Sequence, residues 1–68
     1  MLLPQNEAWV NRLIAECQNS PDETQWWTIG NQMHTITDDY KMLYDYPSAK
    51  PELDAMWDEW IKADPRDK

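Results

Sequence analysis

Two side chains, His34 and Asp38, have the types and the spacing that acid–base chemistry uses. They lie four residues apart in a segment that predicts helix, so an imidazole base could face an orienting carboxylate or bind a metal weakly. The alternative is an ordinary surface pair across one helical turn. No third ligand and no nucleophile accompanies them at a suggestive spacing. We therefore favour the surface pair and expect no enzyme, no catalytic residue, no metal site and no cofactor.

The single cysteine, Cys17, is the second candidate for chemistry. One cysteine cannot form an intramolecular disulfide, and one Cys with one His cannot supply the four ligands of a zinc site. Cys17 lies on an apolar stripe at helical spacing, which favours a buried small hydrophobe over a reactive thiol. The neighbouring Glu16 would raise its pKa. A free thiol is compatible with a reducing cytoplasm, the predicted location.

Acidic side chains form the third candidate. The chain has 13 acidic and 6 basic residues, a net charge of −7, which disfavours direct contact with nucleic acids or anionic membranes and favours a protein with a basic surface. Asp54 and Asp58 are four apart, so a helix would bring them within about 5–6 Å at Cβ. Such rows can imitate the phosphates of a nucleic acid. The alternative is that the charge only keeps a small protein soluble.

Aromatic side chains accompany these acids. Five Trp and three Tyr in 68 residues exceed what a minimal core needs, and Trp and Tyr are enriched at binding hot spots. Trp27 could instead cap the core. We predict a partner-binding surface made of Trp27, Tyr44, Tyr46, Trp60, Asp38, Asp39, Asp45, Asp54, Asp58 and Glu59.

Three helices must position these residues, and the sequence predicts them over residues 7–18, 21–44 and 51–63. Asn6 is the predicted N-cap of the first helix, the run Ser20-Pro21-Asp22-Glu23 reads as a capping box, and Pro51 is placed to open the third. The alternative to one continuous helix over 21–44 is a kink or break near Gly30, because glycine weakens a helix interior. The predicted fold is all-α, either a three-helix bundle or a long central helix flanked by two shorter antiparallel helices.

The middle helix carries an apolar seam spaced 3, 4, 3, 4 and 3, typical of a coiled coil: Trp26, Ile29, Met33, Ile36, Tyr40 and Leu43. At a predicted 24 residues or so it would overhang its shorter neighbours by about 15 Å. An overhanging apolar seam needs another chain to cover it. We therefore expect a homodimer, by self-association along this seam, or an obligate complex with a different protein.

Together these features predict a single acidic protein-binding domain without catalytic activity. By analogy of size and charge, the leading hypothesis is a small viral or mobile-element inhibitor that occludes the basic, nucleic-acid-binding surface of a host protein. The alternative is an oligomeric adaptor or chaperone that docks partner helices on its apolar seam. The sequence shows no basic-then-apolar leader and no apolar run of about 18 residues.

Overall fold

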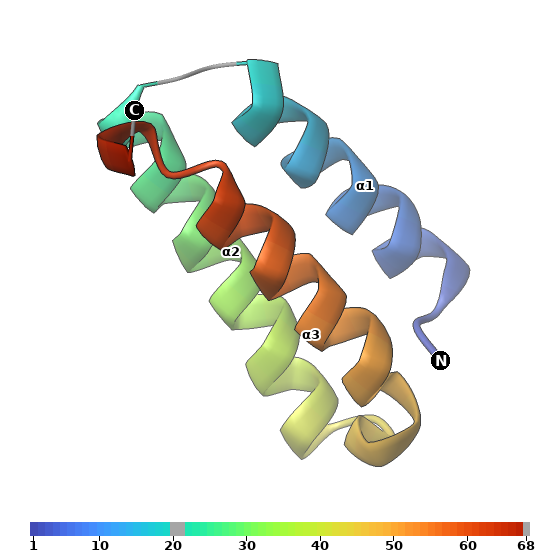
Figure 1. Cartoon of the computed structure of the whole chain (residues 1–68). Coiled ribbons are helices and arrows are strands. Elements are labelled where there is room, and N and C mark those ends of the chain that lie inside the picture. The colour runs from blue at the N-terminus through green and yellow to red at the C-terminus, as the bar shows by residue number, and fades with distance from the viewer. Residues whose placement is uncertain (20–21, 68) are drawn as a thin grey trace.

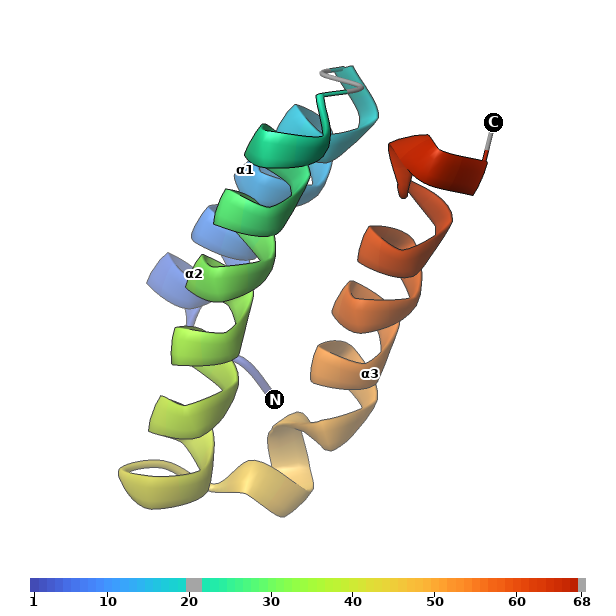
Figure 2. The same ribbon diagram turned by 90° about the vertical axis from the view of Figure 1, so that its left-hand side faces the viewer.

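The computed structural model describes residues 1–19 and 22–67 and forms a three-helix bundle. The helices are α1 (Pro4–Asn19), α2 (Glu23–Met42) and α3 (Tyr46–Lys62), followed by the short 3₁₀ helix η1 (Pro65–Asp67). Each helix runs antiparallel to the one before it, and α2 and α3 lie side by side along their length (Figures 1 and 2). No strand occurs in the two described ranges. The predicted all-α fold is therefore confirmed.

α1 begins at Pro4, three residues before the predicted start. The Leu3 carbonyl accepts hydrogen bonds from the amides of Asn6 and Glu7, so the chain is already helical at Asn6. The prediction of Asn6 as the N-cap is wrong for a tertiary reason: its side-chain amide donates to the Tyr40 hydroxyl at 3.0 Å. Pro4 occupies the first helical position, where its missing N–H costs nothing.

α2 begins after Asp22, which is its N-cap. The backbone of Asp22 is extended, and its carboxylate accepts a hydrogen bond from the Thr24 amide at 2.9 Å. The Ser20 and Pro21 positions of the predicted capping box lie outside the described residues. The helix ends at Met42, two residues before the predicted end, and it continues through Gly30. The alternative of a break at Gly30 does not occur, and Gly30 lets the Trp60 ring approach α2.

α3 begins at Tyr46, five residues before the predicted start. Of two prolines four residues apart, Pro47 lies in the first turn and Pro51 lies inside the helix. Proline is tolerated in a first turn, where amides have no intrahelical partner. Inside a helix, a proline loses the hydrogen bond to the carbonyl four residues earlier and its ring crowds that carbonyl. Pro51 lies one turn into α3 at an exposed position, and the helix includes both prolines despite this cost.

The core contains side chains from all three helices and from the N-terminal segment: Leu2, Val10, Leu13, Cys17, Trp26, Ile29, Met33, Ile36, Tyr40, Ala49, Leu53 and Met56. Five of the six predicted seam residues, all except Leu43, belong to this single-chain core. Leu43 is 71% exposed. The seam is thus correctly apolar, but its assignment to a second chain is wrong, because α1 and α3 cover it.

The overhang expected for the middle helix is also absent. α2 has 20 residues, against 16 in α1 and 17 in α3, because both neighbours begin earlier than predicted. Self-association therefore loses its geometric argument and stays an untested prediction. No helix in the described ranges is both long and apolar enough to cross a membrane.

Candidate functional site

Two tryptophans from different helices hold the N-terminal part of α2 against the C-terminal part of α3. The Trp26 and Trp60 rings stack with centroids 3.9 Å apart and planes 3° from parallel. Each indole N–H donates to the other residue's backbone carbonyl, at 2.7 Å from Trp26 and 2.8 Å from Trp60. The pair is reciprocal and leaves neither indole N–H unpaired. Trp60, predicted to contact a partner, is half-buried and engaged inside the bundle.

Gly30 makes this stacking possible. A Cβ atom at this position would lie 2.6 Å from Cζ2 of Trp60 and 2.9 Å from its Cε2. Carbon atoms pack at about 3.5–4.0 Å. Because glycine has no Cβ, the Trp60 ring can pack closely against α2. This contact explains why a residue that weakens helices lies inside an unbroken helix.

Trp27 is the exposed member of this aromatic group. Its ring is 46% exposed, yet it makes edge contacts to Trp26 at 4.7 Å and to Trp60 at 5.7 Å between centroids. The guanidinium of Arg66 lies 5.3 Å from its centroid and 5.1 Å from that of Trp26. A large aromatic surface is thus presented to solvent and held in place from three sides.

Arg66 is positioned by Asp64, which is 8% exposed and makes a bidentate contact to the guanidinium, the shortest distance being 2.8 Å. The same carboxylate accepts from the Arg66 amide at 2.9 Å. Hydrogen bonding to Arg66 lowers the pKa of Asp64 below its ordinary value. The sequence predicts a loose tail after Pro65, and that prediction is wrong for Arg66, because the indoles give it a surface to pack on.

The remaining predicted aromatic contacts lie elsewhere. Tyr44 is exposed, with its ring 5.0 Å from that of Tyr40, and Tyr46 is half-buried beneath the Lys41 ammonium at 5.4 Å. Tyr44 lies between α2 and α3 and Tyr46 is the first residue of α3, whereas Trp27 lies in the first two turns of α2, at the opposite end of that helix. At 1.5 Å per residue the two ends are about 25 Å apart. The predicted aromatic residues therefore do not form one site.

The predicted acids divide in the same way. Asp38, Asp39 and Asp45 are exposed near the α2–α3 turn, while Asp54 and Asp58 are exposed along α3. Asp54 accepts from Lys50 at 2.7 Å, Glu59 lies 3.5 Å from Lys62, and His34 Nδ1 lies 3.1 Å from Asp38. Each of the three pairs joins two exposed residues of the same helix, one turn apart, and such pairs contribute little to stability.

The His34–Asp38 geometry agrees with the surface pair favoured from the sequence. Within residues 1–19 and 22–67, no three His, Cys, Asp or Glu side chains gather closely enough to hold a metal ion. Cys17 is buried, as predicted, and burial raises the pKa of its thiol, with a further increase from the Glu16 carboxylate.

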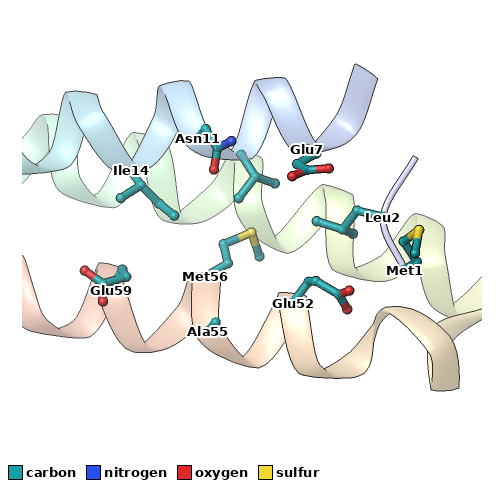
Figure 3. Close-up of a pocket in the computed structure, with 10 residues that line it drawn as sticks. Met1, Leu2, Glu7, Asn11, Ile14, Glu52, Ala55, Met56 and Glu59 are labelled. Atoms are coloured by element: carbon teal, nitrogen blue, oxygen red, sulfur yellow. The ribbon is translucent and has the colours of Figure 1, made fainter. Parts of the chain in front are cut away.

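A groove between α1 and α3 is a feature that sequence reasoning missed. It has a volume of about 430 Å³ and an apolar floor that includes Leu2, Val10 and Met56. Glu7, Glu52 and Glu59 line it as well (Figure 3). Glu59, predicted to share a surface with Asp58, instead faces α1. The sequence places Glu52 and Glu59 seven residues apart, which predicts that they lie on one face of their helix. Glu7 comes close to them only because α1 packs against α3.

Comparison of this chain with protein families, with curated proteins and with solved structures found no match.

Proposed function

We propose that this protein is a non-catalytic binding protein that attaches to a basic surface of another protein and occludes it. The observation that carries the proposal is Trp27, an indole that is almost half exposed but fixed by two other indoles and a guanidinium. Binding usually costs the ordering of side chains at the interface. A side chain already ordered in the free protein avoids that cost, as hot-spot tryptophans do.

An apolar and acidic strip of α3 extends this contact surface. Trp57 packs edge-on against Trp60 at 5.4 Å, and its indole N–H donates to Thr37 of α2 at 3.0 Å. Ile61 follows Trp57 by one turn and is 55% exposed. Asp54 and Asp58 lie within one turn of Trp57 on the exposed side of the helix. We call Trp27, Trp57, Ile61, Asp54 and Asp58 the Trp27 surface.

Electrostatic attraction supplies the second part of the proposal. With a net charge of −7, the protein attracts a basic partner over a distance and orients the encounter. Asp54 and Asp58 are suited to meet the Lys and Arg side chains that normally contact nucleic-acid phosphates. On this reading the protein competes with a nucleic acid for its partner. The lone thiol fits a reducing compartment, and we propose the cytoplasm as the place of action.

Affinity capture from the native host with wild-type and variant proteins tests the contact. Trp27→Ala should reduce recovery of the partner at least tenfold, because a central anchor contributes about 2 kcal/mol or more. Leu43→Ala, which removes an even more exposed apolar side chain just beyond the C-terminal end of α2, is the control and should recover the partner like wild type. Equal recovery by Trp27→Ala would overturn the assignment of this surface.

The electrostatic part has its own measurement. The double variant Asp54→Lys with Asp58→Lys should slow association with the captured partner about tenfold or more at low salt and much less at high salt. Glu16→Lys with Glu23→Lys makes the same charge change on α1 and at the start of α2 and should have a smaller effect. Association rates that are equal for the two double variants would refute steering by this surface, provided that both keep their helical circular dichroism.

The alternative function, an oligomeric adaptor with an apolar seam, depended on residues that the fold buries. What remains exposed near that seam is Met42, Leu43 and Tyr44 at the α2–α3 turn. Sedimentation at two concentrations measures whether these three side chains bring two copies together. A dimer that Leu43→Ala dissociates would favour the adaptor.

A further inference from the structure

The α1–α3 groove is an apolar surface that α2 does not cover. Its floor consists of core side chains, and Figure 3 shows Met56 rising from α3 toward α1, with Leu2 and Ile14 to either side. Its volume of about 430 Å³ lies within the range of about 300–1,000 Å³ typical of ligand sites. A partner that covered this floor would remove apolar surface from water.

Carboxylates stand on both walls of the groove. Glu7 belongs to α1, and Glu52 and Glu59 belong to α3. No described residue that lines the groove has a basic side chain, although the α-ammonium of Met1 lies at one end of the groove, where it donates to the Ser48 carbonyl. Glu59 has a neighbouring cation, Lys62 at 3.5 Å, and both of those side chains are substantially exposed. The groove therefore combines an apolar floor with a negative rim, which selects an occupant that is apolar on one face and cationic along its edges.

We propose that this groove binds an amphipathic α-helix of a partner protein, with apolar side chains inserted into the groove and Lys or Arg on both flanks. The proposal goes beyond the Trp27 surface, because it assigns a second site and the structural class of its ligand. Seating a fourth helix between α1 and α3 would extend the three-helix bundle to four helices.

The spacing of the lining residues supports a helical ligand. Glu52 and Glu59 are seven residues apart, or about 10.5 Å at 1.5 Å per residue. Two turns of a bound helix have the same length, so cations seven apart on the ligand would meet both carboxylates. Helices that bind in grooves insert apolar side chains at intervals of three, four and seven residues. A groove two turns long accommodates two or three such side chains.

Charge argues against other occupants. A fatty acid or an anionic lipid would bring its own negative charge to a rim of three glutamates. A second copy of this chain carries a net charge of −7 and would be repelled for the same reason. A protein helix with apolar residues on one face and cationic residues along its edges matches both the apolar floor and the glutamates of the rim.

The test uses a synthetic amphipathic peptide of Leu and Lys, with all Leu on one helical face, and a scrambled peptide of the same composition. Ala55 is exposed and lines the groove, so Ala55→Trp fills it without removing a charge or a core residue. Ala8→Trp adds the same ring at an exposed α1 position that does not line the groove. Calorimetry should show at least a tenfold higher Kd for Ala55→Trp, and an unchanged Kd for Ala8→Trp. The scrambled peptide should bind at least tenfold more weakly than the amphipathic one.

A second pair of variants measures the rim. Glu52→Gln with Glu59→Gln should raise the Kd of the amphipathic peptide about fivefold at low salt, since exposed ion pairs each change binding by small factors. Glu16→Gln with Glu23→Gln removes the same charge outside the groove and should change Kd less than twofold. Equal effects of the two double variants would show attraction by net charge alone and would overturn the groove.

Methyl NMR of the wild-type protein keeps the test decisive if Ala55→Trp fails to fold. The peptide should shift the methyl signal of Met56, in the groove floor, and leave that of Met42, which is exposed and does not line the groove, in place. The opposite result overturns the proposal, as does a wild-type homodimer that Ala55→Trp dissociates. If Trp27→Ala weakens peptide binding and Ala55→Trp does not, the groove inference fails while the proposed function survives.

Discussion

Substituting Ala for Gly30 is the sharpest test of the tryptophan packing, because ordinary helix propensity predicts the opposite result. In an exposed helix interior Gly→Ala stabilises by about 1 kcal/mol. Here the new methyl group would lie 2.6 Å from Cζ2 of Trp60 and 3.1 Å from its Nε1. The ring must therefore retreat from α2 by roughly 1 Å to reach normal contact distance.

Retreat of the Trp60 ring disturbs two interactions. It lengthens the 2.8 Å hydrogen bond to the Trp26 carbonyl, worth about 1 kcal/mol, and displaces a stacked pair worth about 0.5–1.5 kcal/mol. Overpacking of a core generally costs about 1–3 kcal/mol. Set against the propensity gain of about 1 kcal/mol, the net loss for Gly30→Ala is about 0.5–1.5 kcal/mol. For a domain of this size that lowers the Tm by about 2–12 °C.

Urea unfolding followed by helical circular dichroism measures the change without relying on tryptophan fluorescence. Trp60→Leu removes the ring that the methyl group would strike. In that background Gly30→Ala should become stabilising, by up to about 1 kcal/mol. A change of sign between the two backgrounds is the expected result. Stabilisation by Gly30→Ala in the wild-type background would refute the close approach of Trp60 to α2.

Three further predictions concern single groups. Tyr40→Phe deprives the Leu3 amide of its acceptor at 2.7 Å, so the free energy of unfolding should fall by about 1–2 kcal/mol and amide exchange at Leu3 should accelerate; unchanged exchange would contradict this. Asp64→Asn should lower stability at pH 7. The Asp64 contact to Arg66 lowers its folded pKa, so its contribution is present above the ordinary pKa of 3.8 and is lost as pH falls through the folded value. Urea midpoints of wild type and variant should therefore converge toward pH 2, and a constant difference would count against it. Cys17, buried with a raised pKa, should react with a thiol reagent at least about tenfold more slowly than free cysteine and speed up in urea; fast reaction in the native protein would argue against burial.

The Trp27 surface and the α1–α3 groove make different demands on a partner. The first offers a fixed indole beside carboxylates, and the second offers an apolar floor between glutamates. α3 contributes to both, through Asp58 on one side and Glu59 on another. Consecutive helical residues point about 100° apart. One acidic helix can therefore serve two sites, and the variants proposed above separate them.

The sequence by itself determined the number of helices, their approximate positions and the apolar side of each. Proline and apolar periodicity act locally, within a few residues, so their effects can be read without knowing the fold. The stripe from Trp26 to Tyr40 shows the strength of this information, since all five of its residues at steps of three and four are buried. Helix starts were less accurate. Where two prolines lay four apart, at Pro47 and Pro51, local rules did not say which one opened the helix.

Only the tertiary structure decided what covers each apolar side and which distant residues meet. Periodicity gives the direction of a stripe relative to its own helix axis, but the rotation and neighbours of the helix depend on packing among all three. Hence the stripe on α2 is covered by α1 and α3 and not by another chain. The reciprocal bonds of Trp26 and Trp60 join residues 34 apart, and Gly30 owes its role to them. The groove exists because α1 and α3 pack against each other, and this packing brings Glu7 and Glu52, 45 positions apart in the sequence, to its two walls.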